Sequence, residues 1–322
     1  MNNIFANIQG DKTLWAVLIL LAGFSFLPVY SAASNLAYVS GSGNTFNYLF
    51  KHFIHLSLGF TFMYLMQKIP YHYFRGISIL MIPVVIVLLL YTIFQPSVTD
   101  SLTNTNRWIK IPFVGFTFQP STLAGVILMI YVSRYLAKIK DIDVRFSQTI
   151  LPLWIPTLFI LLLILPANFS TTAIIFSMVI LLCFVGGYPV KHLVGIVLSG
   201  ILVLSIFILT IKAYPGIFPN RVDTWKSRIE NFVNKENTTE NYQIEKAKIA
   251  IATGGVRGLG PGKSVQKNFL PQSSSDFIFA IIIEEYGLIG GLFLLTVYAL
   301  FLLRIIIISN KAESVFGSLL VI

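Results

Sequence analysis

The stretch DFIFAIIIEEYGLIGGLFLLTVYALFLLRIIII, residues 276–308, decides the fold class. A transmembrane helix needs about 20 mostly apolar residues, and charged side chains interrupt this longer run at Asp276, Glu284, Glu285 and Arg304. The whole chain follows the same pattern, because 56% of its 322 residues are hydrophobic and 11% are charged. Soluble domains carry roughly 25% charged residues. Composition therefore excludes a cytosolic enzyme, a secreted disulfide scaffold and a disordered tail, and it predicts an integral membrane protein.

Apolar runs along the chain predict an all-α fold, a polytopic membrane helical bundle with eight spans. The predicted spans are residues 14–34, 46–66, 77–94, 119–137, 150–166, 171–187, 191–211 and 276–308. We expect a single membrane domain over residues 1–322, in which residues 212–275 form a large extracytoplasmic loop between spans seven and eight. The single cysteine, Cys183, lies in the sixth run, which predicts a buried apolar side chain.

Basic residues are distributed unequally over the short loops, and this bias predicts the orientation. One side of the membrane holds ten of them, whereas the other side holds Arg107 and Lys110. The ten are Lys12, Lys68, Arg75, Arg134, Lys138, Lys140, Arg145, Lys191, Arg304 and Lys311. The N-terminus is therefore expected in the cytoplasm and residues 212–275 outside. That outer loop has ten basic and five acidic residues, which favours an anionic substrate.

A glycine-rich segment, residues 254–264 (GGVRGLGPGKS), resembles a Walker A loop but does not fit it. The first glycine that this loop requires is replaced by Arg257, so no nucleotide cofactor is expected. The basic residues form no compact patch, so no nucleic-acid partner is expected either. The glycines instead predict a tight loop whose backbone approaches another group closely. The four histidines do not have metal-ligand spacing, so the sequence assigns no metal ligands.

Acidic residues are scarce, which makes their positions informative. Asp276 stands at the outer end of the eighth span, and Glu284 and Glu285 lie inside it. Ionised groups in a bilayer cost several kcal/mol unless they are paired or hydrated. The two glutamates form either a buried pair that locks helices together, with Lys51 as partner, or a functional group. For Asp276, beside the basic glycine-rich loop, a functional role is favoured.

Several segments together resemble the shape, elongation, division and sporulation family. They are residues 107–109 (RWI), 119–121 (QPS), 254–255 (GG), 262–267 (GKSVQK), 270–271 (LP), 276–280 (DFIFA) and 284–290 (EEYGLIG). The resemblance runs from the first span to the end of the sequence. The form of residues 262–267 is more similar to the division members of the family than to its elongation members.

Members of this family are peptidoglycan glycosyltransferases that polymerise lipid II on the outer face of the bacterial cytoplasmic membrane. The resemblance implies this activity during cell division, with lipid II as substrate. It also implies a class B penicillin-binding transpeptidase and other divisome proteins as partners, and a divalent cation, Mg²⁺ or Mn²⁺, as cofactor. The family has ten spans, whereas this sequence stops near the start of a ninth, so we expect a truncated sequence.

Polymerising lipid II joins a sugar hydroxyl to an anomeric carbon whose leaving group is a polyprenyl pyrophosphate. The reaction needs a base for the hydroxyl and positive charge for the pyrophosphate. We expect Asp276, partly removed from water beside Phe277 and Phe279, to be the catalytic base. The outward cations expected to bind the substrate are Arg107, Lys110, Arg221, Arg257, Lys263 and Lys267.

Two alternatives to a polymerase stay open. A flippase for lipid-linked precursors would depend on Glu284 and Glu285 more than on Asp276. A non-catalytic scaffold would dock a transpeptidase and tolerate the loss of Asp276.

Four positions depart from the family pattern in ways that neutralise or remove charge. They are Thr122, Gly125, Asn168 and Gln272, where the family often has Glu, Lys, Asp and Glu. Because the family aspartate is intact as Asp276, the sequence favours an enzyme.

Overall fold

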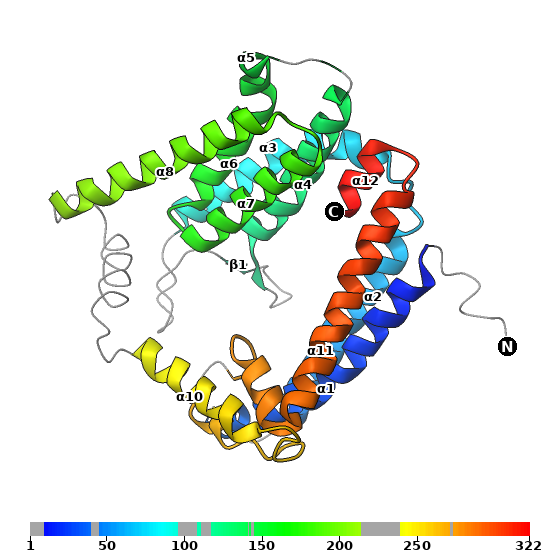
Figure 1. Ribbon diagram of the computed structural model, residues 1–322, viewed down its shortest axis with the longest axis vertical. Coiled ribbons are helices and arrows are strands. Elements are labelled where there is room, and N and C mark those ends of the chain that lie inside the picture. The colour runs from blue at the N-terminus through cyan, green and yellow to red at the C-terminus, as the bar shows by residue number, and fades with distance from the viewer. Residues whose placement is uncertain are drawn as a thin grey trace. The chain divides into compact units, whose positions relative to one another are not determined.

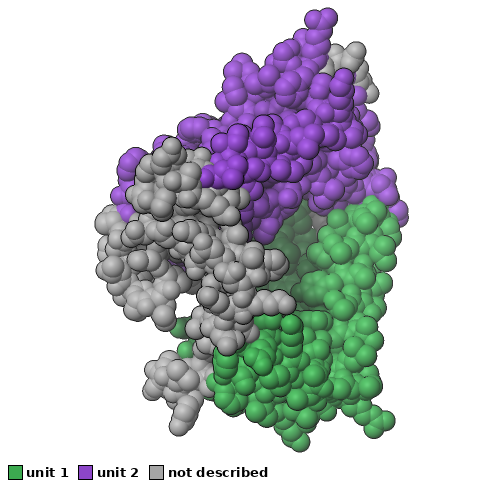
Figure 2. Space-filling model, turned by 60° about the vertical axis from the view of Figure 1, so that its left-hand side comes forward, with its two compact units in different colours: residues 1–69, 225–307 green, residues 70–224, 308–322 purple. Residues whose placement is uncertain are grey.

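The structure, a computed structural model, describes residues 10–39, 45–95, 108–110, 117–140, 142, 145–213, 239–270 and 273–322. The chain divides into two compact units, which Figure 2 draws in green and purple. Unit 1 comprises residues 1–69 and 225–307, and unit 2 comprises residues 70–224 and 308–322.

Unit 1 is built on three long helices, α1 (Lys12–Val39), α2 (Thr45–Met66) and α11 (Ile278–Lys311), the last of which ends in unit 2. They run side by side in Figure 1. A shorter helix, α10 (Thr239–Gly254), and a 3-10 turn, η3 (Gln266–Asn268), lie at one end of these helices. The loop between α10 and η3 contains the glycine-rich segment.

Aromatic side chains connect the long helices of unit 1. Trp15 of α1 stacks on Phe60 of α2, with ring centroids 6.2 Å apart. Phe24 of α1 contacts Tyr286 and Phe293 of α11, each at 5.8 Å. Such pairs contribute about 0.5–1.5 kcal/mol beyond the area that they bury.

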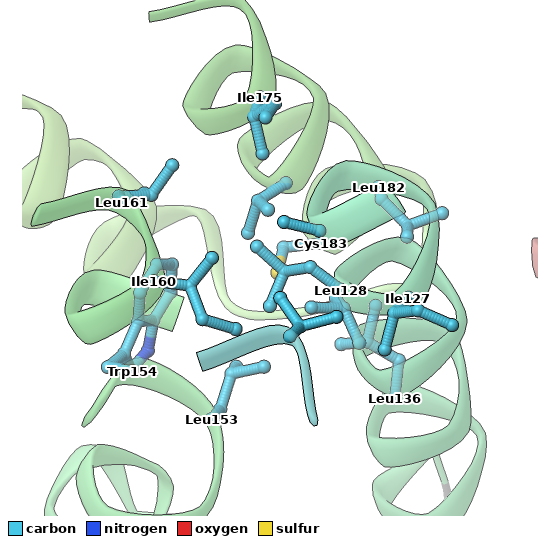
Figure 3. Close-up of a cluster of buried hydrophobic side chains, with 14 of the residues drawn as sticks. Ile127, Leu128, Leu136, Leu153, Trp154, Ile160, Leu161, Ile175, Leu182 and Cys183 are labelled. Atoms are coloured by element: carbon cyan, nitrogen blue, oxygen red, sulfur yellow. The ribbon is translucent and has the colours of Figure 1, made fainter. Parts of the chain in front are cut away.

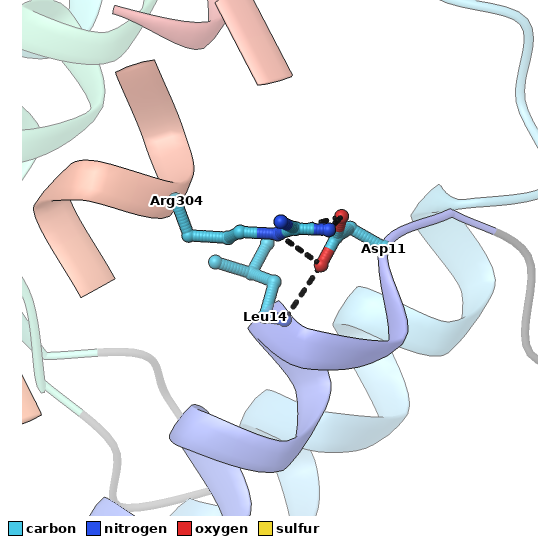
Figure 4. A network of polar contacts seen from close by, with 3 residues as sticks. All are labelled: Asp11, Leu14 and Arg304. Atoms are coloured by element: carbon cyan, nitrogen blue, oxygen red, sulfur yellow. Dashed lines mark hydrogen bonds and ion pairs between the residues drawn. The ribbon is translucent and has the colours of Figure 1, made fainter. Parts of the chain in front are cut away.

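An ion pair joins the start of α1 to the far part of α11 (Figure 4). The Nε atom of Arg304 donates to both carboxylate oxygens of Asp11 at 2.9 Å. The backbone amide of Leu14 donates to the same carboxylate at 2.9 Å, so Asp11 also caps the first turn of α1. The contact places these two helix ends on the same side of unit 1, the side opposite α10 and the glycine-rich segment (Figure 1).

Unit 2 contains most of the remaining elements. The helices are α3 (Tyr73–Phe94), α4 (Pro120–Ile139), α5 (Phe146–Thr149), the π-helix η2 (Ile150–Trp154), α6 (Ile155–Ile164), α7 (Phe169–Val185), α8 (Val190–Ala213) and α12 (Val315–Val321). Two short strands, β1 (Ile109–Lys110) and β2 (Thr117–Phe118), pair antiparallel with Ile109 opposite Phe118.

The core of unit 2 lies around α4, which packs against α3, α7 and α12. Figure 3 shows aliphatic side chains from several helices meeting there. Leu128 and Leu136 of α4, Leu153 of η2 and Ile160 of α6 are fully buried. Cys183 of α7 is also fully buried, so the prediction for the single cysteine is confirmed.

The fifth predicted span contains two prolines, Pro152 inside the π-helix η2 and Pro156 at the start of α6. Pro156 lacks the amide that would bond to the carbonyl of Pro152 in an α-helix. The hydroxyl of Tyr131 on α4 donates to that carbonyl instead. This carbonyl thereby has a side-chain donor on a neighbouring helix, a way of pairing backbone groups that suits a membrane interior.

The eight predicted spans all coincide with helices of the described residues, which confirms the all-α, multi-pass membrane fold. Five helical stretches are long and apolar enough to cross a bilayer: α1, α3, α4, Phe146–Ile164 and α11. Apolar but shorter stretches are α7 and residues Val190–Ile206 of α8. The remaining span, α2, carries Lys51, His52 and His55.

The Asp11–Arg304 pair predicts a pH-dependent contribution to stability. Hydrogen bonds from Arg304, aided by the amide of Leu14, lower the pKa of Asp11 from 3.8 to about 2 against the opposing effect of burial. A carboxyl whose pKa is lower in the folded state stabilises it above the unfolded pKa, and this contribution is lost as the pH falls through the folded pKa. Asp11→Asn keeps an N-cap acceptor but removes the charge.

We therefore expect Asp11→Asn to lower the Tm of the detergent-solubilised protein at pH 6. The difference from wild type should shrink between about pH 4 and pH 2, where Asp11 itself becomes protonated. Thermal melts of both proteins across this range measure it. A difference in Tm that stays constant down to pH 2 would contradict the assignment.

Candidate functional site

The helix that carries the acidic residues is broken at Gly287. This residue has φ 68° and ψ −171°, a conformation that side chains disfavour and glycine tolerates. In an unbroken helix the carbonyls of Glu284 and Glu285 would accept from amides four residues later. Here they accept from the amides of Leu259 and Gly260 in the glycine-rich segment, both at 2.9 Å.

The amides on the other side of the break are satisfied by the same segment. Leu288 donates to the carbonyl of Gly255 at 2.9 Å, and Ile289 donates to the carbonyl of Val256 at 3.3 Å. Two carbonyls and two amides of α11 at the break are thus hydrogen-bonded to the backbone of the glycine-rich segment. Because unpaired peptide groups are costly in a bilayer, this exchange holds the loop on the helix.

Two glycines of the loop permit this close approach. A Cβ atom at Gly258 would lie 2.2 Å from the carbonyl oxygen of Glu285, and one at Gly254 would lie 2.1 Å from that of Ile283. Both contacts are with backbone, which cannot turn aside as a flexible side chain does. The expectation of a backbone that approaches another group is confirmed, and that group is α11.

The carboxylate of Glu284 binds the turn that follows the glycines. It accepts from the hydroxyl of Ser264, from the amide of Val265 at 3.0 Å and from the amide of Gln266 at 3.3 Å. Its side chain is 1% exposed. A carboxylate that accepts several backbone amides is stabilised in place, since hydrogen bonds to a charged group are about twice as strong as neutral ones.

The carboxylate of Glu285 joins this turn to α1. Its Oε1 atom accepts from the hydroxyl of Ser31 and from the amide of Ser264 at 3.2 Å. The ammonium of Lys267 donates to the same Ser31 hydroxyl at 3.2 Å and to the carbonyl of Gly262 at 2.8 Å. The Lys267 ammonium and the Glu285 carboxylate are therefore joined through one serine hydroxyl.

Lys51 is not the partner of these glutamates, contrary to the prediction. It lies on α2 with an exposed side chain, and the contacts recorded for Glu284 and Glu285 in the described residues are those to serine hydroxyls and backbone amides. The prediction assumed that a buried carboxylate needs an ionic partner. A turn of backbone amides can serve in its place.

Asp276 lies in the turn that leads into α11, two residues before the helix begins. Its side chain is exposed. The expected partial removal from water beside Phe277 and Phe279 is therefore wrong. The carboxylate is accessible to a ligand.

Three of the six predicted cations have described side chains, and all three belong to the same loop as the glycines. Arg257 and Lys263 are exposed, and Lys267 is half-buried at its contacts with Ser31 and Gly262. Arg107 and Arg221 lie outside the described residues, as does the side chain of Lys110, whose backbone is in β1.

Two further motifs meet in unit 2. Ser121 of the QPS segment, Asn168 of residues 166–171 (PANFST) and Thr92 line a small pocket. The cavity volume of this pocket, about 10 Å³, is roughly what one water needs. Asn168 caps α7 by accepting from the amide of Thr171 at 3.2 Å. Asn and Asp are equally good caps, so this departure from the family leaves the local structure intact.

The other departures have simpler surroundings. Thr122 is exposed in the first turn of α4, where its hydroxyl is 3.4 Å from the side-chain oxygen of Gln119. Gly125 faces Ile175 of α7 at ordinary contact distance. Gln272 lies outside the described residues.

The described residues could bind a divalent cation through one carboxylate together with substrate phosphates. Among them, no three His, Cys, Asp or Glu side chains gather as a ready metal cage. Mg²⁺ commonly binds through one or two carboxylates together with substrate phosphates. The exposed carboxylate of Asp276 offers a ligand of this kind.

Sequence reasoning missed Ser31 and Ser264, the hydroxyls that bind the two glutamates. Ser31 had no distinguishing pattern in the sequence. Ser264 lies in the segment GKSVQK, which carried the family resemblance without indicating a role for the serine.

Comparison with known proteins gives consistent matches. The model of the cell cycle protein family FtsW/RodA/SpoVE matches residues 11–322. A protein of Marinomonas mediterranea named "Probable peptidoglycan glycosyltransferase FtsW" is 31% identical over 313 residues, which cover 95% of this chain and 73% of that protein. A protein of the same name from Geobacter sulfurreducens is 28% identical over 316 residues, covering 96% and 80%.

Solved structures share the fold. One described as "Structural coordination of polymerization and crosslinking by a peptidoglycan synthase complex" matches with a TM-score of 0.68 at 19% identity, covering 97% of this chain and 81% of that chain. The rod shape determining protein RodA from Thermus thermophilus matches with a TM-score of 0.63 at 18% identity, covering 97% and 79%.

The loop contacts predict a severe effect of Gly258→Ala. The new methyl group would meet the backbone of Glu285, so the loop must move away from α11. Gly255→Ala is the matched control, because Gly255 also has a positive φ of 54° but open space around it. We expect a loss of about 2–5 kcal/mol for Gly258→Ala and about 1–2 kcal/mol for the control.

Thermal melts of the two solubilised variants measure this difference. Equal Tm values for the two variants would show that the loop does not lie against the helix.

Proposed function

The chain belongs to the FtsW/RodA/SpoVE family of cell cycle proteins, and we propose that it is a peptidoglycan glycosyltransferase that polymerises lipid II during cell division. Relatives that carry the name of this activity match 95–96% of the chain. The observation that carries the proposal is the exposed Asp276 at the start of α11, the helix to which a lysine-bearing loop is bonded.

The proposed reaction is a single displacement at the anomeric carbon of one lipid-linked sugar. The carboxylate of Asp276 takes the proton of the acceptor hydroxyl, and the hydroxyl oxygen forms a bond to that carbon. The bond from the same carbon to the pyrophosphate breaks, and its electron pair leaves with the pyrophosphate. A base and a stabilised leaving group are the two requirements of this chemistry.

Positive charge for the leaving group comes from the predicted set of outward cations. Arg257, Lys263 and Lys267 are the described members of the predicted set, and Arg107, Lys110 and Arg221 complete it. Charge that develops on the pyrophosphate in the transition state is stabilised by cations held in place beforehand.

A divalent cation, Mg²⁺ or Mn²⁺, belongs to the proposal. Asp276 would hold it together with the substrate pyrophosphate, and when bound it would supply further positive charge to the leaving group.

The proposed orientation puts the N-terminus in the cytoplasm and the glycine-rich segment outside the bacterial cytoplasmic membrane. The excess of basic residues on one side supports it. In unit 1, the start of α1, which the Asp11–Arg304 pair joins to α11, lies at the end opposite α10 (Figure 1). A class B penicillin-binding transpeptidase is the proposed partner, together with other divisome proteins, and the match to a chain of a peptidoglycan synthase complex supports this class of partner.

The flippase alternative has less support. It needs Glu284 and Glu285 to line a polar path, whereas both carboxylates are buried and bonded to the loop and to α1. The scaffold alternative is separated from the polymerase by the experiment below.

Asp276→Asn tests the proposal. Because the side chain is exposed, the variant should fold as wild type, and loss of the base should lower polymerisation by about 100-fold or more. The measurement is the length distribution of glycan made from labelled lipid II with Mn²⁺ and the transpeptidase partner. Glu245→Gln, an exposed acid on α10, is the matched control and should polymerise as wild type.

A wild-type rate for Asp276→Asn would remove the proposed base. A folded wild-type complex that makes no glycan would favour the scaffold or the flippase.

A further inference from the structure

We propose that Glu284 is a positioning residue that holds the lysine-bearing turn, residues 263–267, against the half of α11 that follows Asp276. The inference rests on the proposed polymerase function, because it assigns the turn the task of presenting cations to the substrate pyrophosphate. The contacts of one buried carboxylate carry it.

The first step concerns the direction of the turn's donors. The hydroxyl of Ser264 and the amides of Val265 and Gln266 all donate to the carboxylate of Glu284. Three consecutive residues therefore turn their polar hydrogens inward onto one buried group. Charge-assisted hydrogen bonds at three consecutive residues hold the backbone of this turn in place, and with it the points at which Lys263 and Lys267 leave the backbone.

The second step concerns what these positions do for Lys267. Its backbone amide donates to the Ser264 hydroxyl oxygen at 3.2 Å, the same oxygen that donates to Glu284. Its ammonium is bonded to Gly262 and Ser31. Because Glu284 fixes the Ser264 hydroxyl, it also helps to fix the backbone of Lys267. Lys263 is the residue immediately before Ser264.

The third step concerns the helix. Glu284 lies before the break at Gly287, in the same half of α11 that begins two residues after Asp276. The carboxylate thus ties the cationic turn to the part of α11 that directly follows the turn containing the proposed base. Small displacements of a positioned group are costly to catalysis, which is why a clamp of this kind matters for rate.

The fourth step separates positioning from charge. In Glu284→Gln, the amide oxygen can accept from Val265 and Gln266, and the amide nitrogen can donate to the Ser264 oxygen, since a hydroxyl also accepts. Glu284→Leu leaves the hydroxyl and both amides without a partner in a buried site. A positioning role therefore predicts that Gln substitutes for Glu and that Leu does not.

The experiment measures tryptic cleavage after Lys263 and Lys267, and kcat and KM for labelled lipid II, in the full chain with its transpeptidase partner. For Glu284→Leu we expect cleavage about tenfold faster and kcat/KM about tenfold lower than wild type, as expected from the loss of charge-assisted hydrogen bonds. Glu284→Gln should recover most of both losses. Glu245→Leu, on the exposed face of α10, is the control and should change neither.

A second variant keeps the test decisive if Glu284→Leu does not fold. Ser264→Ala removes the hydroxyl donor and keeps the hydrogen bonds from the amides of Val265 and Gln266 to Glu284. The variant should therefore fold and lower kcat/KM severalfold. Where the double variant can be made, it should be no worse than Glu284→Leu alone, because both changes act on the same contact.

Three results would overturn the inference: a Gln variant as impaired as the Leu variant, unchanged cleavage in Glu284→Leu, or wild-type kcat/KM in Ser264→Ala. The first would make the charge of Glu284 the essential property. Failure of the proposed function is distinguishable, because tryptic cleavage reports the clamp even if the wild-type complex makes no glycan.

Discussion

The exchange of backbone hydrogen bonds at Gly287 is the constraint on which unit 1 depends. The break in α11 leaves two carbonyls and two amides that a bilayer cannot hydrate, and the glycine-rich segment provides their partners. Because the loop must come within backbone contact of the helix, Gly254 and Gly258 have no room for a side chain. The glycine-rich segment is therefore held against α11 by backbone hydrogen bonds.

The candidate site follows from this arrangement. Once the loop lies on α11, the next turn reaches Glu284, and Ser264 links that turn through Glu285 to Ser31 of α1. The turn that bears Lys263 and Lys267 is then held on α11, the helix that begins two residues after Asp276. Unit 2 is stabilised differently, by close packing of aliphatic side chains around α4, as Figure 3 shows. In unit 1 buried polar contacts determine the position of the loop, whereas in unit 2 apolar packing is the main stabilising interaction.

The sequence predicted the helices well, because long apolar runs have few structures open to them in a membrane. It also identified Asp276, Glu284 and Glu285, because acids are scarce in such runs. It misjudged the surroundings of these residues. Flanking phenylalanines do not bury Asp276, whose side chain is exposed in the turn before α11. The glutamates bind serine hydroxyls and backbone amides in place of Lys51. Contacts such as that of Gly258 with Glu285 join distant parts of the chain, which local patterns do not encode.

Hydrogen exchange of the wild-type protein in lipid nanodiscs tests the central claim most directly, because it reads the backbone bonds themselves. The account predicts that the amides of Leu259, Gly260, Leu288 and Ile289 exchange as slowly as those in the helical parts of α11. Exchange of Leu259 and Gly260 at the rate of an unprotected loop would contradict it, because the loop would then not supply the partners of the broken helix.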